Sequence, residues 1–225
     1  MEYDWTFKNY EKILSLGKKK GYSFLTCADY YQEKKAGRKL PKKIIIMRHD
    51  VDDRIGRIKG YLDAEKRQRV AATYFFRVHA KYNLFSYRCY ELLKRVREEG
   101  HEIGLHTEVL DFVFAHREKS EDILRREIAA LEAVSGARIK GVAPHRDLSY
   151  HENSLPFVQK FNLKKFGLMY QSYDPLFTLD MEYVNESLNP HICWKSKSPE
   201  QAIGSFDKIY IMTHPRFWFN RYYNE

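Results

Sequence analysis

Two aspartates follow directly after an apolar run and are the first residues in the sequence that could do chemistry. The run is 43–47, and Asp50 and Asp52 are two residues apart, so both side chains can point to one side of a strand end. Asp53 adds a third carboxylate. Carboxylates this close repel each other, and a divalent cation would relieve the repulsion. Helix N-caps are the simpler alternative, so the segment predicts either a metal-associated pair or caps.

A histidine closes another apolar run. His106 ends the run 101–106, whereas His101 begins it. If the run is a strand, only its last residue reaches the strand end at which the aspartates lie. We therefore expect His106 to be a metal ligand and His101 to be structural.

Two further apolar runs end in the same kind of residue. His145 and Arg146 follow 138–143, and His214 follows 208–213. Four segment ends therefore carry aspartate, histidine or arginine. Oxygen and nitrogen donors with a remaining open position suit catalytic zinc or a similar divalent ion. Such an ion lowers the pKa of a bound water and polarises a carbonyl group.

The elements that must hold these residues alternate between strand and helix. The predicted strands are 43–47, 71–76, 101–106, 138–143, 165–170, 181–184 and 208–213. The predicted helices between them are 55–69, 87–99 and 118–134. This alternation predicts parallel βαβ units, and about seven strands favour a closed or nearly closed α/β barrel. In such barrels the chemistry lies at the carboxyl ends of the strands.

Length and composition bound the class of protein. The 225 residues are 44% hydrophobic and 31% charged, which is too apolar for a disordered chain and too polar for a membrane protein. We expect a single domain over 1–225, in which 1–40 is a helical N-terminal segment. The three cysteines form no zinc-like pair and no disulfide framework, and the start lacks the pattern of a secretory signal. We therefore expect a cytoplasmic protein without a membrane span.

The net charge of +9 raises the question of a polyanionic partner. The cations are interspersed with acids along the chain, and no nucleic-acid-binding signature accompanies them. We therefore expect no nucleic-acid partner. A positive field could still favour an anionic carbohydrate substrate. The oligomeric state stays open.

The order of these segments resembles the NodB-homology polysaccharide deacetylases, which form carbohydrate esterase family 4. The residues that carry the resemblance are 46–52, 100–106, 143–146 and 209–214, and it extends over about 40–218. The paired aspartates are similar to the HDVD variant, which is found in a group associated with surface-polysaccharide synthesis. The resemblance implies a distorted (β/α) barrel and a metal-dependent hydrolase of the N-acetyl amide of a sugar.

Carried over residue by residue, the resemblance implies that Asp50 is the catalytic base and that Asp52 and His106 bind the metal, expected to be zinc. The family has another histidine four residues after His106, where this sequence has Leu110. The third ligand is therefore open. The candidates are, in order, His145, then Glu108 or Asp111, and last His116.

The remaining catalytic roles complete a hypothesis for amide hydrolysis. Arg146 would help to keep Asp50 ionised, and His214 would protonate the departing amine. The same site could hydrolyse another non-peptide C–N bond. A protein that lost a metal ligand could instead be a catalytically silent carbohydrate-binding homologue.

Overall fold

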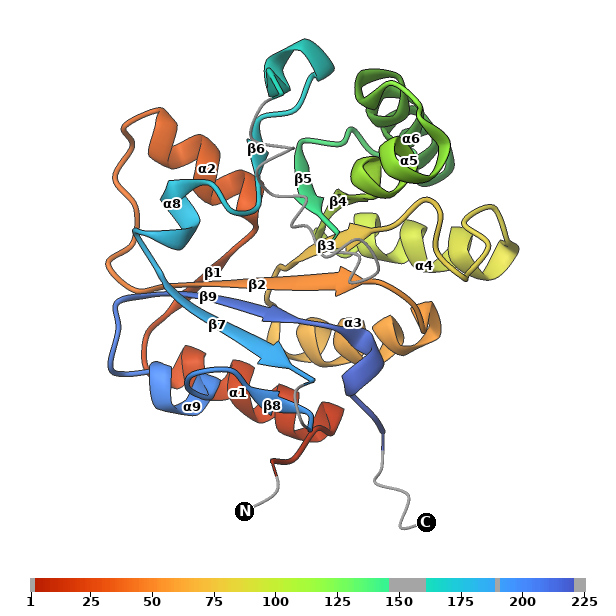
Figure 1. Cartoon of the computed structure of the whole chain (residues 1–225). Coiled ribbons are helices and arrows are strands. Elements are labelled where there is room, and N and C mark those ends of the chain that lie inside the picture. Colours follow the sequence, from red (N-terminus) through yellow and green to blue (C-terminus); the bar gives the residue numbers. More distant parts are fainter. Residues whose placement is uncertain (1–2, 146–160, 189–190, 221–225) are drawn as a thin grey trace.

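The computed structural model describes residues 3–145, 161–188 and 191–220, and it contains a strongly curved, mostly parallel sheet. The strands are β1 (Ser23–Leu25), β2 (Ile44–Val51), β3 (Thr73–Phe76), β4 (Glu102–Thr107), β5 (Gly141–Pro144), β6 (Tyr170–Gln171), β7 (Glu182–Ser187), β8 (Cys193–Trp194) and β9 (Lys208–Thr213). Their order is β6-β5-β4-β3-β2-β9-β7-β8, and β1 pairs with the first half of β2. Among the strands of the described residues, only β8 is antiparallel to its neighbour. In Figure 1 the arrowheads of β2, β7 and β9 point to the same side of the molecule.

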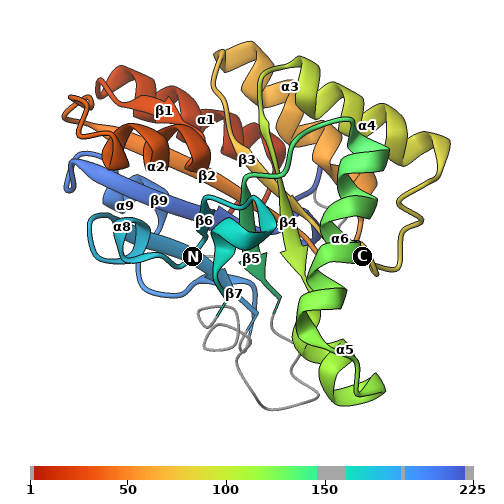
Figure 2. The same cartoon turned by 90° about the horizontal axis from the view of Figure 1, so that it is seen from above.

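Most of the helices cover the outer side of this sheet. The α-helices are α1 (Phe7–Lys19), α2 (Cys27–Lys35), α3 (Ile58–Gln68), α4 (Tyr87–Glu98), α5 (Val109–His116), α6 (Ser120–Ser135), α8 (Pro175–Thr178) and α9 (Pro199–Ala202). Short 3₁₀ turns are η1 (Ile55–Arg57), η3 (Leu163–Phe166) and η4 (Pro215–Phe217). Figure 2 shows α3, α4 and α6 side by side around the outside of the curve. Among the described residues, no helix has the length and apolar character needed to cross a membrane.

The alternation of side chains along β2 separates two apolar cores. Ile45 and Met47 face the outer helices, whereas Ile44 and Ile46 face the concave side of the sheet. All eight residues of β2 are buried, as expected of a central parallel strand covered on both faces. The even-numbered residues that follow Ile46 continue along the concave face. The strand therefore delivers a row of charged side chains to the open end of the curve.

The other end of the concave face is closed by α2 and α8. Tyr30 of α2 and Phe177 of α8 pack against each other and join Ile44 and Tyr210 in the concave core. The backbone N–H of Ala28 donates to the carboxylate of Glu102 at the start of β4. Among the described residues, α2 and α8 thus cover the concave face at the amino ends of the strands.

The predicted architecture is confirmed, with local differences. The seven strands from β6 to β7 in the sheet order are parallel to their neighbours, as expected. The sheet is a curled half-barrel, because within the described residues no strand pairing closes β6 onto β7 or β8. The predicted strand 165–170 is wrong for most of its length, because η3 occupies Leu163–Phe166 and β6 begins only at Tyr170. The segment 1–40 contains α1 and α2 as expected, and also β1, which the prediction lacks.

Candidate active site

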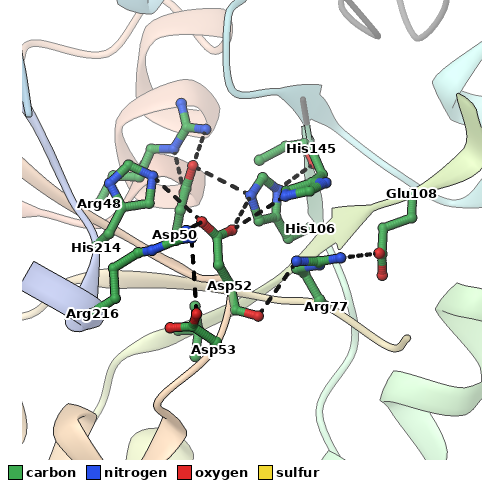
Figure 3. Close-up of polar contacts among 12 residues, drawn as sticks. Arg48, Asp50, Asp52, Asp53, Arg77, His106, Glu108, His145, His214 and Arg216 are labelled. Carbon is green, nitrogen blue, oxygen red and sulfur yellow. Dashed lines mark hydrogen bonds and ion pairs between the residues drawn. The ribbon is translucent and has the colours of Figure 1, made fainter. Parts of the chain in front are cut away.

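Arg48 and Asp50 form a buried ion pair on the concave face of β2 (Figure 3). The Nε and Nη2 atoms of Arg48 donate to the two carboxylate oxygens of Asp50, each at 2.7 Å. Arg48 is fully buried, and its guanidinium lies 4.8 Å from the centre of the Tyr173 ring. Burial raises the pKa of Asp50, but the charges of Arg48, His106 and His214 and the hydrogen bonds from Arg48 together outweigh it, so that pKa is lowered. Asp50 is therefore held as a carboxylate.

Asp52 lies beyond Asp50 at the end of the strand and faces His106 of β4. Its Oδ1 atom is 3.2 Å from Nε2 of His106, while Nδ1 of His106 is 2.9 Å from the carbonyl oxygen of Ala143. The Nδ1–H donates to that carbonyl, which leaves Nε2 directed at the aspartates. A histidine oriented by a backbone carbonyl in this way is the usual arrangement of a metal ligand. The pKa of His106 is raised: burial opposes its charge, but the carboxylates of Asp50 and Asp52 prevail.

His145 reaches the same carboxylate from the end of β5. Its Nε2 atom lies 3.7 Å from Oδ1 of Asp52, and its ring centre lies 5.1 Å from that of His106. Ligand atoms of Asp52, His106 and His145 all lie within 4.8 Å of one another. Within the described part of the chain, Oδ1 of Asp52 is buried without a hydrogen bond of normal geometry. One carboxylate and two imidazoles around a buried, unsatisfied oxygen fit a divalent ion such as zinc.

The other ligand candidates lie farther from Asp52. Glu108 pairs with Arg77, which occupies its carboxylate. Asp111 forms a second group with Glu108 and His145, and its Oδ2 atom is 3.8 Å from Nδ1 of His145. His116 lies at the far end of α5, where its ring contacts Phe112. Among the candidates, His145 alone shares a group with Asp52 and His106.

His214 stands on the opposite side of the aspartates. It follows β9, which pairs directly with β2, so the strands that carry Asp50 and His214 are neighbours. Nε2 of His214 lies 3.9 Å from Oδ2 of Asp52, and Nδ1 lies 3.1 Å from the carboxylate of Glu186 on β7. The pKa of His214 is raised, because Glu186 and the aspartates outweigh the effect of burial. His214 is therefore placed to carry a proton.

Arg48 and Glu186 are functional residues that the sequence analysis missed. Arg48 precedes Asp50 by two positions on a strand, a spacing that puts both side chains on one face and could have revealed the pair. Glu186 had no such signal, because only the fold brings β7 beside β9. Arg146, predicted to keep Asp50 ionised, lies outside the described residues. Arg48 supplies that positive charge in the described structure.

The outer face of the same strands holds a buried polar network that anchors the site. Nδ1 of His49 lies 2.7 Å from the Thr213 hydroxyl, and its Nε2 lies 2.8 Å from the Glu65 carboxylate of α3. Tyr10 donates to the same carboxylate at 2.6 Å. His101 lies at the start of β4, where its Nδ1 accepts from the backbone N–H of Ala72, as expected of a structural histidine. These bonds hold β2 and β9 in register one residue away from Asp50 and His214.

The sequence and the structure were compared with those of known proteins. No protein-family model and no curated protein matches the sequence. Among solved structures, IcaB from Ammonifex degensii is 20% identical with a TM-score of 0.51, and the match covers 61% of this chain and 65% of IcaB. Peptidoglycan deacetylase PdaC from Bacillus subtilis is 19% identical (TM-score 0.48; 78% and 76% covered). A CE4 family pseudoenzyme from Bacillus anthracis is 14% identical (TM-score 0.44; 79% and 57% covered).

These likenesses concern the fold. The curled half-barrel has the architecture of the family 4 deacetylase structures, so the resemblance predicted from the sequence is confirmed at the level of the fold. The chain spans less than two thirds of the length of the IcaB chain it matches, at 65%. The activity is therefore argued from the side chains of this site.

Proposed function

We propose that this protein is a metal-dependent deacetylase that hydrolyses the N-acetyl amide of a sugar. The observation that carries the proposal is that a proton acceptor and a proton donor lie on opposite sides of one site lined by carboxylates. Asp50 is ionised against Arg48 on one side, and His214 has a raised pKa on the other. Deacetylase names among similar solved structures support the choice of reaction.

Asp52, His106 and His145 would hold the metal. Their donor atoms form the group that contains the unsatisfied oxygen of Asp52. A divalent ion bound there would polarise the amide carbonyl and lower the pKa of a water molecule. Zinc suits one carboxylate and two imidazoles, and His145 takes the place of the histidine that position 110 lacks.

The residues of the chain divide the proton transfers. Asp50 accepts a proton from the attacking water, because Arg48 keeps it ionised inside a buried site. A C–O bond forms at the carbonyl carbon and the C–N bond breaks. His214 donates a proton to the departing nitrogen, while Glu186 holds its Nδ1 and fixes the orientation of the ring. The products are acetate and a free amino sugar.

The direct test is acetate release from N-acetylated sugars by the zinc-loaded protein and its Asp50→Asn variant. We expect the variant to lose roughly 100-fold or more in kcat, as for removal of a general base, and to keep its metal content. Undiminished turnover would remove Asp50 as the base. Normal metal content without acetate release by the unaltered protein would instead favour a silent carbohydrate-binding homologue.

We also propose that the protein works in a reducing compartment such as the cytoplasm. Cys27, Cys89 and Cys193 are all free thiols, and two of them are buried. Free cysteines are typical of proteins that are kept reduced.

A further inference from the structure

A cavity of about 620 Å³ lies beside the active site and is lined mainly by cationic side chains. Its polar lining is Arg54, Arg57, Lys81 and Arg88, with Asp53 as the only carboxylate. The lining is completed by Ile55, Gly56 and Tyr82. Four cations against one carboxylate give the cavity a strongly positive field, and a concave surface concentrates such a field.

Three of these cations are unpaired within the described part of the chain. The side chains of Arg54, Lys81 and Arg88 form no ion pair or hydrogen bond with any described residue, and all three are exposed. Other surface arginines of this protein do find carboxylates: Arg67 pairs with Glu11 at 2.8 Å and Arg95 with Asp63 at 2.7 Å. The cluster around the cavity is therefore not the ordinary mixed surface of the molecule.

The backbone around the cavity brings these cations together at a cost. Arg54 adopts a left-handed conformation with a φ of 47°, which residues other than glycine rarely take. The pKa of Arg57 is lowered, first by its partial burial and then by the charge of Arg54. The guanidinium of Arg88 lies against Gly56, where an added Cβ would be only 1.9 Å from Nη2. Four cations are thus held close with Asp53 as the one carboxylate of the lining.

The cavity lies next to the candidate catalytic residues. Asp53 lines it and is the next residue after the metal-site Asp52, and Arg216 bridges the two, 3.5 Å from Asp52 and 3.8 Å from Asp53 (Figure 3). The hydroxyl of Tyr82 lies 3.0 Å from the carbonyl oxygen of Val51 at the end of β2. A molecule bound in the cavity would therefore lie next to the candidate metal site.

We propose that this cavity binds a phosphate or diphosphate group carried by the carbohydrate substrate, so that the sugar's N-acetyl group reaches Asp50. The inference rests on the proposed function and specifies its substrate class. Three unpaired cations match a multiply charged anion better than the single charge of a uronic acid. Guanidinium groups bind phosphate oxygens through pairs of parallel hydrogen bonds, which suits Arg54 and Arg88.

The test uses calorimetric binding of pyrophosphate, inorganic phosphate and glucuronate to the full chain. The protein is first dialysed against a chelator that is then removed, so that pyrophosphate cannot be captured by a metal at the catalytic site. We expect pyrophosphate to bind most tightly and glucuronate most weakly. The double variant Arg54→Gln/Lys81→Gln and the single variant Arg88→Gln should each weaken pyrophosphate binding at least tenfold.

The matched control is Lys12→Gln/Lys39→Gln, which removes the same charge from exposed sites outside the cavity lining. It should bind pyrophosphate as the unaltered protein does. Unchanged pyrophosphate binding by both cavity variants would overturn the proposal, as would glucuronate binding as tight as that of pyrophosphate. Because these readouts need no catalysis, they stand apart from acetate release. A failure of the deacetylase proposal would leave them interpretable.

Discussion

The ion pair between Arg48 and Asp50 gives the sharpest prediction of the structure. Arg48→Met would remove a fully buried guanidinium and leave a carboxylate that is only 3% exposed without its partner. Breaking a buried pair in this way costs about 3–5 kcal/mol of stability. An aspartate beside an arginine has its pKa lowered by about 1–3, and each pKa unit corresponds to about 1.4 kcal/mol. Both routes give a loss of a few kcal/mol.

The same change should alter catalysis through the pH dependence. In the folded protein the pKa of Asp50 is lowered, so Asp50 contributes stability that is present above the unfolded value and is lost as the pH falls through the folded value. Removing Arg48 should raise that pKa, because the strongest of the charges that oppose burial is then lost. The acidic limb of kcat/KM for acetate release should therefore move up by about 1–3 pH units.

Urea unfolding of four proteins tests this reasoning without relying on activity. They are the unaltered protein, Arg48→Met, Asp50→Asn and the double variant, all freed of metal. We expect the double variant to be more stable than Arg48→Met, because it no longer buries an unpaired charge. Arg67→Met is the matched control, because Nε and Nη2 of Arg67 also donate hydrogen bonds to one carboxylate, that of Glu11, but at an exposed site. Its loss should cost less than about 1 kcal/mol of stability. Additive effects of the two buried substitutions, or an unmoved acidic limb, would refute the argument.

Three further predictions concern the candidate metal site, the support of the proton donor and one buried carboxylate. His145→Ala should lower the zinc-to-protein ratio measured by elemental analysis, and an unchanged ratio would exclude it as a ligand. Glu186→Gln should lower kcat by roughly 10- to 100-fold with little change in KM. Glu186 accepts hydrogen bonds from the backbone N–H and Nδ1 of His214 and from the indole of Trp218, and the N–H₂ group of an amide would face one of these donors. Rates equal to those of the unaltered protein would show that His214 needs no such support. Burial raises the pKa of Glu127 from 4.5 to about 7, so the folded state binds the extra proton between those values and loses about 3 kcal/mol of stability as the pH rises through them. Glu127→Gln should flatten that part of the stability curve in urea unfolding at pH 5 and pH 8, and parallel curves would contradict this account.

Local patterns in the sequence predicted much of the fold. Asp50 and His106 come at or just after the ends of short apolar runs, because a buried parallel strand is apolar until it reaches the edge of the sheet. This pattern predicted that both residues lie at the carboxyl edge of the sheet. Strand ends were less certain where the pattern was weak, as at 165–170, where Lys164 and Lys165 belong to a 3₁₀ turn. The strand β1 has only three residues, and no periodicity identifies so short an element.

Partners that come together only through tertiary contacts were beyond sequence reasoning. The choice of His145 among several ligand candidates depended on which side chain lies within reach of Asp52, a question of distance and not of residue type. Glu186 faces His214 only because β7 pairs with β9 across a gap in the sequence.

The sequence by itself determined the parallel α/β architecture and the placement of aspartates and histidines at the strand ends, because strand alternation and apolar runs are local properties. The tertiary structure decided that the Arg48–Asp50 pair is buried, which their two-residue spacing does not by itself ensure. It also brought Arg54, Lys81 and Arg88, from separate segments, around one cavity beside the site. Electrostatic environment is set by distance and burial in space, and no spacing along the chain encodes those quantities.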